Sequence, residues 1–327
     1  MLNEMDKRLI QLLSAGASVS TMKKNTGLYE YQIAARLKKL RNLGYQISRQ
    51  LKNKDLLFKL EKDIVNNSMK DKVDIKVNNY FRFLVLSDTH VCGIYERLDL
   101  LKNAYDYAET NKINHCFQID SAHKFSPEEQ FLIPNTEDQI KYLIKNYPKR
   151  NNIITSVILG NHDYYSVQDE GLDISRMIED KRLDIVTLGY VSSSIKINNR
   201  YIVLHHPFDF HNKKMRADQN LLREYEKINP DIIFTGHLHK TGIYQEEDKK
   251  VLVNVPAMIS HEKNYPSAFD CILISSNSTS DLDILIIKPL MLEPKVIPVT
   301  EIKYDLPKKV LTREMNQIEK FNAKYNK

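Results

Sequence analysis

The chain of 327 residues is long enough for one large hydrophobic core or two unequal ones, and its 42% hydrophobic and 28% charged residues exclude general disorder. No apolar run approaches the ~20 residues that cross a bilayer, and the first residues lack the basic and then apolar order of a secretory signal, so we expect a cytoplasmic protein without a membrane partner. Three widely spaced cysteines fit a reducing compartment and exclude a thiolate metal cluster.

The formal net charge of +6 is distributed unevenly. Residues 1–72 hold 15 Lys and Arg against 7 Asp and Glu, a net charge of +8, which leaves −2 for the remainder. The basic character therefore belongs to the N-terminal region, where it favours an anionic partner.

The N-terminal region has the pattern of three helices followed by a hairpin. Apolar residues recur at helical spacing, Ser18 or Ser20 can cap the second helix, and Gly27 and Gly44 can end the second and third. The expected helices cover 6–13, 19–25 and 29–43, and the hairpin strands cover 45–51 and 56–60. This order resembles a winged helix-turn-helix domain over residues 1–65.

Polar and basic side chains of the third helix lie away from its apolar stripe. Here they can reach phosphates or base edges of nucleic acid, and the residues concerned are Gln32, Arg36, Lys38, Lys39 and Arg41. A solvated basic face and a protein-docking surface are the alternatives. We expect nucleic-acid contact because of the local charge.

After a polar linker at 66–78, apolar strands and helical patterns alternate, which predicts an α/β domain over 79–300. The expected strands are 81–87, 113–119, 153–159, 201–204 and 231–235. The expected helices are 98–109, 127–146, 172–180 and 215–227. Further strands at 251–258, 268–274, 282–287 and 295–300 close the domain, and the tail over 301–327 ends in an amphipathic helix at 311–324.

Metal-ligand residues follow each of the first five strands. The segments are Asp88-Thr89-His90, Asp120, Asn161-His162, His205-His206 and His237-Leu238-His239, and they contain six of the ten histidines. Strand carboxyl ends are where an α/β sheet builds its site. Carboxylate, imidazole and amide ligands without thiolate suit Mn²⁺, Fe or Zn²⁺, and seven protein ligands suit two divalent ions better than one.

In this order, Asp88-x-His90, Asp120, Gly160-Asn161-His162-Asp163, His205 and Gly236-His237-Leu238-His239 resemble the motifs of the calcineurin-like metallophosphoesterases. The resemblance covers residues 80–290. It implies a four-layer αββα sandwich of two mixed sheets flanked by helices, and an enzyme that hydrolyses phosphate esters.

The resemblance also implies roles for single residues. Asp88, His90 and His239 would hold the first metal, manganese being favoured over iron and zinc. Asn161, His205 and His237 would hold the second. Asp120 would bridge both, and His162 would be the catalytic histidine. His205 is preferred to His206 as a ligand because Pro207 supplies the x-Pro step that follows the family's histidine, which leaves His206 on the substrate side.

Two cations ~3.5 to 4 Å apart lower the pKa of a shared water and bind phosphoryl oxygens, so hydroxide is the expected nucleophile. His162 can then protonate the leaving group. Asp163 either orients this imidazole or serves as a carboxylate at a helix N-terminus.

One position departs from the family pattern, because Ile119 stands where glycine normally precedes the bridging aspartate. A branched side chain here can displace Asp120 or narrow the cleft. Because residues 1–65 are basic and resemble a winged helix-turn-helix domain, we expect a phosphodiesterase or nuclease acting on or near nucleic acid. The alternative is a nucleic-acid-binding regulatory protein with an inactive phosphoesterase domain.

Overall fold

The computed structural model describes residues 2–43, 45, 47–52, 55–60, 73–120, 132–133, 135–160, 163, 171–190, 192–207, 229–245, 250–259, 267–277, 281–292, 296–298 and 301–306. The helices expected at 215–227 and 311–324 lie outside these residues, as do Asn161, His162 and part of the helix expected at 127–146.

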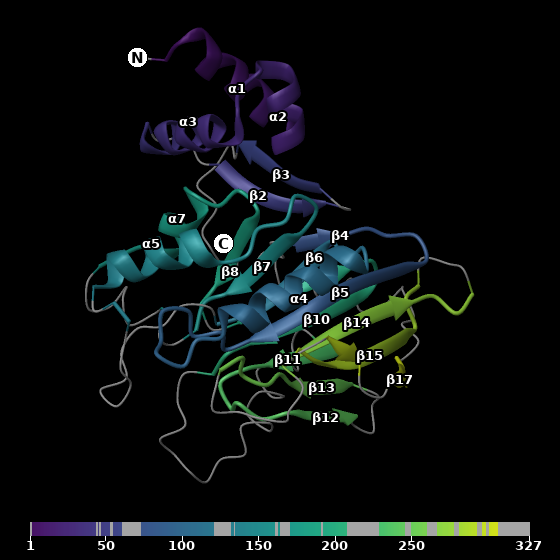
Figure 1. The fold of residues 1–327 in the computed structure, drawn as a ribbon. Coiled ribbons are helices and arrows are strands. Elements are labelled where there is room, and N and C mark those ends of the chain that lie inside the picture. Colours follow the sequence, from purple (N-terminus) through teal and green to yellow (C-terminus); the bar gives the residue numbers. More distant parts are fainter. Residues whose placement is uncertain are drawn as a thin grey trace, which may run out of the picture.

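Two mixed β-sheets form the centre of the molecule (Figure 1). The first has nine strands in the order β1 (Ala17–Ser18), β3 (Asp55–Leu60), β2 (Ile47–Lys52), β4 (Val73–Ile75), β9 (Ser192–Ile197), β10 (Arg200–His205), β11 (Ile232–Thr235), β13 (Val251–Asn254) and β12 (Gly242–Gln245). The second runs β16 (Ile297–Pro298), β15 (Ile284–Met291), β14 (Ala268–Ile274), β5 (Tyr80–Ser87), β6 (His115–Ile119), β7 (Ile154–Ile158) and β8 (Ile185–Gly189), with β17 (Ile302–Asp305) paired to β15.

Helices cover the outer face of the second sheet. These are α4 (Leu98–Thr110), α5 (Thr136–Asn146) and α7 (Ile174–Glu179). Strand β5 is buried on both faces: Phe83 and Val85 belong to the core between the sheets, whereas Leu84 and Leu86 belong to the core under the helices. Helices, sheet and sheet thus form three layers among the described residues, which confirms the expected α/β fold with two packed sheets. The second helical layer of the expected four-layer sandwich is not among the described residues, and the helix expected at 215–227 lies outside them.

Parallel pairing brings the metal-ligand segments to one edge of each sheet. In the second sheet Ser87 pairs with Ile119, and Ile119 pairs with Ile158, so the segments after β5, β6 and β7 leave together. In the first sheet His205 pairs with Thr235, so the segments after β10 and β11 do the same. Residues far apart in the sequence meet at these strand ends for this reason.

The N-terminal region contains the expected three helices and hairpin. They are α1 (Glu4–Ala15), α2 (Val19–Thr26), α3 (Glu30–Asn42) and the β2–β3 pair. The Asn3 side chain accepts a hydrogen bond from the Asp6 backbone nitrogen and so caps α1. The Ser18 side chain caps α2 by accepting a hydrogen bond from the Thr21 backbone nitrogen. Figure 1 shows these helices at one end of the molecule, next to α7.

This region is part of the first sheet. Strand β4 begins at Val73, inside the segment predicted as a linker over 66–78, and pairs with both Leu51 of β2 and Ile195 of β9. The core between the sheets continues without interruption to the apolar side chains of α1, α2 and α3. Short or polar strands, among them β1, β4, β9 and β12, were not predicted, because they lack a long apolar alternation.

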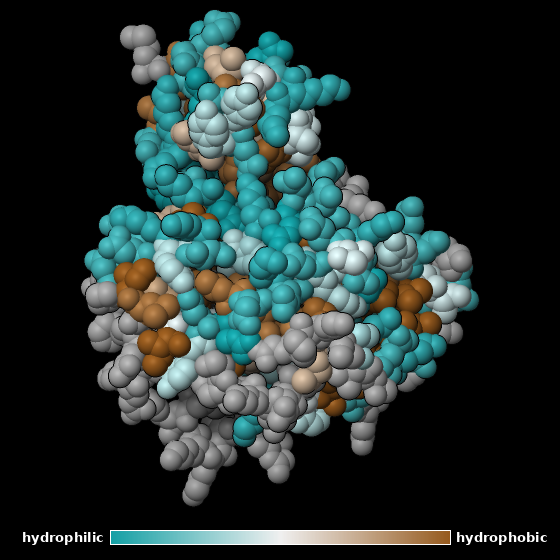
Figure 2. Space-filling view, viewed as in Figure 1, coloured by the Kyte–Doolittle hydropathy of each residue, from teal (hydrophilic) through white to brown (hydrophobic). Residues whose placement is uncertain are grey.

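No helix of the described residues is long and apolar enough to cross a membrane. The face shown in Figure 2 is largely hydrophilic, with hydrophobic side chains exposed in small patches. All three cysteines are buried free thiols.

A buried arginine fastens the N-terminal region to the rest of the molecule. The Arg49 guanidinium on β2 donates to the backbone oxygen of Arg182 at 3.1 Å and to those of Ile185 and Glu179. Burial lowers the pKa of Arg49 to about 10, although the Glu179 carboxylate opposes this shift, so the side chain stays charged at neutral pH. It satisfies three carbonyls around the end of α7 that would otherwise lose their donor.

Replacing Arg49 by methionine is expected to lower the free energy of unfolding by about 3 kcal/mol, because buried carbonyls are left unsatisfied. Urea unfolding followed by circular dichroism measures this. Arg8→Met, at an exposed arginine of α1, is the control and should change stability by less than about 0.5 kcal/mol. Equal stability of the two variants would contradict the role of Arg49.

Candidate metal centre

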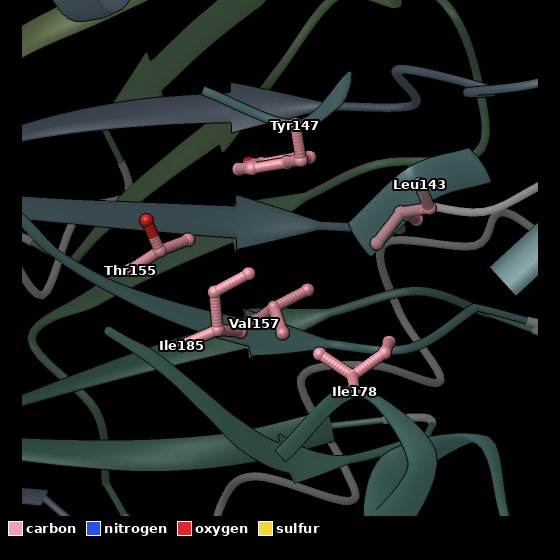
Figure 3. Close-up of a pocket in the computed structure, with 6 residues that line it drawn as sticks. All are labelled: Leu143, Tyr147, Thr155, Val157, Ile178 and Ile185. Carbon is pink, nitrogen blue, oxygen red and sulfur yellow. The ribbon is translucent and has the colours of Figure 1, made fainter. Parts of the chain in front are cut away.

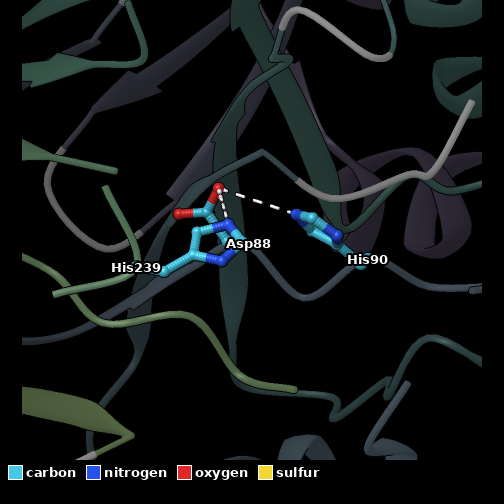
Figure 4. A group of neighbouring side chains, drawn as sticks. All are labelled: Asp88, His90 and His239. Carbon is cyan, nitrogen blue, oxygen red and sulfur yellow. Dashed lines mark ion pairs between the residues drawn. The ribbon is translucent and has the colours of Figure 1, made fainter. Parts of the chain in front are cut away.

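Asp88 lies at the centre of a cluster of imidazoles. Its Oδ1 atom is 3.1 Å from His206 Nε2, 3.6 Å from His239 Nε2 and 3.8 Å from His90 Nε2. Figure 4 shows the Asp88 carboxylate between His90 and His239. The other oxygen, Oδ2, accepts hydrogen bonds from the His237 backbone nitrogen at 2.9 Å and from the Ser87 hydroxyl. One carboxylate oxygen therefore faces the ring nitrogens while the backbone holds the other.

Asp120 is the second carboxylate of the cluster. Its Oδ2 atom is 3.7 Å from the Nε2 atoms of both His90 and His206. Both carboxylate oxygens are fully buried and have no hydrogen bond of normal geometry among the described residues, although the Gly160 backbone and the Asp163 carboxyl group lie close to them. Buried carboxylate oxygens without donors are costly unless a cation or a proton neutralises them, so the pair Asp88 and Asp120 fits a cation.

Two groups of ligand atoms share Asp88. Asp88, His90 and His239 form one, and Asp88, Asp120 and His206 form the other; within each group the atoms lie within 4.8 Å of one another. Carboxylate oxygens and imidazole nitrogens in this arrangement are ligands for a divalent transition metal.

The backbone at these residues adopts an uncommon conformation. The φ angles are 45° at Asp88, 42° at His90, 54° at Asp120, 70° at His237 and 53° at His239. Non-glycine residues rarely occupy this left-handed region, each at a cost on the order of 1 kcal/mol or more, and such strain gathers at functional sites. The fold thus holds these side chains in place against a local preference.

Two glycines make room for the carboxylates. A Cβ atom on Gly160 would lie 2.5 Å from Asp120 Cγ. One on Gly236 would lie 2.8 Å from both Asp88 Oδ2 and Ile119 Cγ2, and it would also collide with the Ser87 hydroxyl. Close approach of side chains, not a turn conformation, therefore requires glycine at both positions.

The fold accommodates Ile119, the residue that stands where the resemblance predicts glycine. Its side chain is fully buried in the core between the two sheets, against the bare backbone of Gly236. The absence of a side chain at position 236 accommodates the methyl groups at position 119. In the structure the Asp120 carboxylate thus remains beside His90 and His206.

The electrostatic environment keeps two of the histidines neutral and opposes the ionisation of Asp120. Burial, followed by the neighbouring His206, lowers the pKa of His205 to about 3 and that of His237 to about 4. Burial, then the Asp163 and Asp88 carboxylates, raise the pKa of Asp120 well above its usual value. Neutral imidazoles are the form that binds metal, and a divalent ion would relieve the repulsion between the carboxylates.

The structure brings together four of the ligands expected from the sequence, namely Asp88, His90, Asp120 and His239. His237 donates its backbone nitrogen to Asp88, but its ring belongs to neither group of candidate ligand atoms. His206, expected on the substrate side, contacts Asp88 directly and packs edge-on against the His237 ring at 4.9 Å. His205, expected as a ligand, ends β10, and its backbone oxygen accepts from Gly236 at 3.0 Å. It belongs to neither group of candidate ligand atoms.

Asp163 is fully buried and accepts a hydrogen bond from the Gly160 backbone nitrogen at 3.0 Å, which closes the turn after β7. Asn161 and His162 lie outside the described residues, so their expected roles stay predictions. Ser87 was missed by sequence reasoning; its only signal is a polar residue at the end of an apolar run, directly before Asp88.

The basic residues of α3 contact other parts of the chain. Arg36 and Lys39 each lie 2.6 Å from Asp6 of α1. Arg41 lies 2.8 Å and Lys38 3.6 Å from Asp180, which follows α7.

The fifth residue of this set, Gln32, caps α3 by accepting from the Tyr29 backbone at 2.9 Å. All five residues predicted to contact nucleic acid therefore take part in interactions within the chain.

A small cavity lies apart from the metal ligands, under α5 and α7. Figure 3 shows its lining, which consists of Leu143, Tyr147, Thr155, Val157, Ile178 and Ile185. The Thr155 hydroxyl is already bonded to the Tyr105 hydroxyl at 2.5 Å. The remaining lining is mainly aliphatic, so this cavity is a packing feature of the helical layer.

Comparison with known proteins finds solved structures of low sequence identity to this chain. No protein-family model and no curated protein matches the sequence. Vps29 from Chaetomium thermophilum aligns over 70% of this chain and 98% of its own, at 14% identity and a TM-score of 0.41. A predicted phosphoesterase from Streptococcus pneumoniae TIGR4 aligns over 70% and 99%, at 14% identity and a TM-score of 0.39. Vps29 from Entamoeba histolytica, complexed with zinc, aligns over 69% and 100%, at 17% identity and a TM-score of 0.40. At this level of likeness the site itself has to carry any functional assignment.

Replacing Gly160 by alanine is expected to weaken Mn²⁺ or Zn²⁺ binding by about tenfold or more, because the new methyl group displaces the Asp120 carboxylate. Isothermal titration calorimetry measures this. Gly242→Ala is the matched control, since its Cβ meets the ring of Tyr244, which is 54% exposed and free to rotate. Unchanged affinity in Gly160→Ala would contradict the placement of Asp120 at the metal.

Proposed function

We propose that this protein is a metal-dependent phosphoesterase that uses two divalent cations. The observation that carries the proposal is the burial of Asp88 and Asp120 side by side, with three imidazole nitrogens facing Asp88 and no hydrogen bond of normal geometry on Asp120 among the described residues. The ordered motifs from Asp88 to His239 support the same activity through their resemblance to the calcineurin-like metallophosphoesterases.

The proposed ligands are Asp88, His90, Asp120, Asn161, His206, His237 and His239. His206 takes the place that the resemblance gives to His205, because its Nε2 lies 3.1 Å from Asp88 and 3.7 Å from Asp120. Manganese is the first candidate, with iron and zinc as alternatives, since the ligands include carboxylates and imidazoles but no thiolate.

When bound, the cations would lower the pKa of a coordinated water and neutralise phosphoryl oxygens. The protein contributes fixed geometry. The His237 backbone and the Ser87 hydroxyl hold Asp88 Oδ2, which leaves Oδ1 directed at the histidines. We assign the protonation of the leaving group to His162, on the resemblance alone.

The substrate class is a phosphate ester, and a diester of nucleic acid is the finer proposal. It is supported by the net charge of residues 1–72 and the helix and hairpin order of the N-terminal region. The contacts of α3 with Asp6 and Asp180 weaken it, because they neutralise the side chains that would meet phosphates.

An inactive regulatory domain is the rival function. Its support in the sequence was Ile119, and the packing of Ile119 against Gly236 leaves the Asp120 carboxylate beside His90. We therefore favour the enzyme.

Asp88→Asn is expected to lower the Mn²⁺-dependent hydrolysis of bis-p-nitrophenyl phosphate by more than about 100-fold, because the carboxylate common to both ligand groups loses its charge. Chelator should abolish the wild-type rate, and added Mn²⁺ should restore it. Release of p-nitrophenol measures both.

Asp270→Asn is the matched control. Asp270 is an equally buried carboxylate, but it pairs with Arg82 near the start of β5, whereas Asp88 follows the end of that strand. Under conditions in which this variant is folded, it should hydrolyse the substrate at the wild-type rate. A wild-type rate insensitive to chelator, or full activity in Asp88→Asn, would falsify the proposed function.

Lys38→Gln tests the nucleic-acid proposal. It should weaken binding to double-stranded DNA. It should also lower the slope of log affinity against log salt concentration by the amount expected for about one phosphate contact. Lys76→Gln is the control, because Lys38 and Lys76 are 50% and 53% exposed and lie 3.6 and 3.4 Å from an aspartate. Fluorescence anisotropy at several salt concentrations gives both quantities. Identical DNA binding in the two variants would count against nucleic acid at α3.

A further inference from the structure

A buried amide stands in the middle of the strand that leads to Asp120. Gln118 is fully buried in β6, between Phe117 of the core between the sheets and Ile119 of the same core. Because side chains alternate along a strand, Gln118 lies on the opposite face, towards α4 and α5. An amide at such a position is costly unless its donors and acceptor are satisfied.

Gln118 forms hydrogen bonds to the segments after two strands. Its Nε2 donates to the backbone oxygen of Asp120 at 2.6 Å and, at 3.4 Å, to the hydroxyl of Thr89. Thr89 lies between the candidate ligands Asp88 and His90. A single side chain therefore ties the segment after β5 to the segment after β6, on the far side from the ligand atoms.

The chemistry of the partners fixes the orientation of this amide. The backbone oxygens of Asp120 and Ile119 only accept hydrogen bonds, so the NH₂ group has to face them. The Gln118 Oε1 atom then faces the hydroxyl of Tyr147, which donates to it at 3.3 Å. The amide has no second orientation that satisfies its neighbours.

One tyrosine of the helical layer contacts the amide, and a second tyrosine contacts only the first. The Tyr105 hydroxyl of α4 donates to that of Tyr147 at 3.3 Å and bonds to Thr155 of β7 at 2.5 Å. Burial raises the pKa values of Tyr105 and Tyr147, so both phenols remain protonated donors at any physiological pH. Tyr147 thus contacts Gln118 directly, whereas Tyr105 contacts only Tyr147 and Thr155 within this network.

We propose that Gln118 is a positioning residue for the metal centre. Its amide holds the Asp120 backbone in the left-handed conformation, with φ 54°, that directs the carboxylate towards His90 and His206. Without this donor the Asp120 carbonyl loses its partner, and the turn relaxes towards an ordinary φ. The inference rests on the metal centre of the proposed function and adds a residue that supports a ligand from behind.

The test compares Gln118→Met, Tyr147→Phe and Tyr105→Phe in the full chain. Methionine keeps the volume of glutamine but removes its donors. Zn²⁺ affinity by calorimetry and the visible absorption of the Co²⁺-loaded protein are measured, together with the unfolding of the metal-free protein. The absorption bands report ligand geometry, which a merely structural role would not change.

Gln118→Met is expected to weaken Zn²⁺ binding by about 10-fold to 100-fold and to shift the Co²⁺ bands. Tyr147→Phe should weaken binding by a smaller factor, because one hydrogen bond to the amide is lost. Tyr105→Phe removes an equally buried hydroxyl that does not touch Gln118, so it should retain wild-type affinity even where it loses stability. Wild-type affinity and an unchanged Co²⁺ spectrum in both Gln118→Met and Tyr147→Phe would overturn the proposal.

Ester hydrolysis is not among these readouts, so the two proposals fail separately. A chain that binds Zn²⁺ through the Gln118 network but cleaves no phosphate ester would refute the proposed function and support this inference.

Discussion

The placement of two carboxylates in the interior, at the ends of neighbouring parallel strands, is the constraint on which the rest of the site depends. Asp88 and Asp120 are 1% and 0% exposed, and buried like charges repel unless a cation or a proton intervenes. The left-handed backbone at both residues and the missing side chains at positions 160 and 236 make this arrangement possible, and burial lowers the pKa of the neighbouring His205 and His237 so that they add no positive charge at neutral pH.

Much of this arrangement could be predicted because apolar runs mark buried strands and the ligands stand directly after them. Strands β5, β6, β7, β10 and β11 were predicted within two residues of their observed bounds. Which of His205 and His206 faces Asp88 could not be predicted in this way, because adjacent residues at a strand end differ only by a rotation of the backbone. That rotation depends on tertiary contacts such as the one between His206 and Asp88.

The effect of Ile119 was also beyond the sequence pattern. Its side chain fits because residue 236, on a strand end of the other sheet, has no side chain. Compensation of this kind links positions far apart in the chain, so a departure at a single position cannot be judged without its partner. The basic charge of α3 also depends on a distant position, because Asp180, the partner of Arg41, lies 139 residues further along the sequence. A count of charges predicts an anionic partner, but it does not tell whether that partner is a ligand or the chain itself.

The N-terminal region and the metal centre are connected through the same strand. Arg49 binds the backbone oxygen of Ile185, the first residue of β8. At the other end of β8, the oxygen of Gly189 accepts from the Leu159 backbone at 2.7 Å, directly before Gly160. The turn that leaves room for Asp120 is thus held by the strand to which the N-terminal region is fastened. Strand β2 also pairs with β4, and β4 pairs with β9 of the same sheet. The N-terminal region is therefore held to the rest of the molecule in two places and is a fixed part of it. A partner bound by this region would therefore stand at a constant orientation to the candidate metal centre, unlike a partner held on a flexible tether.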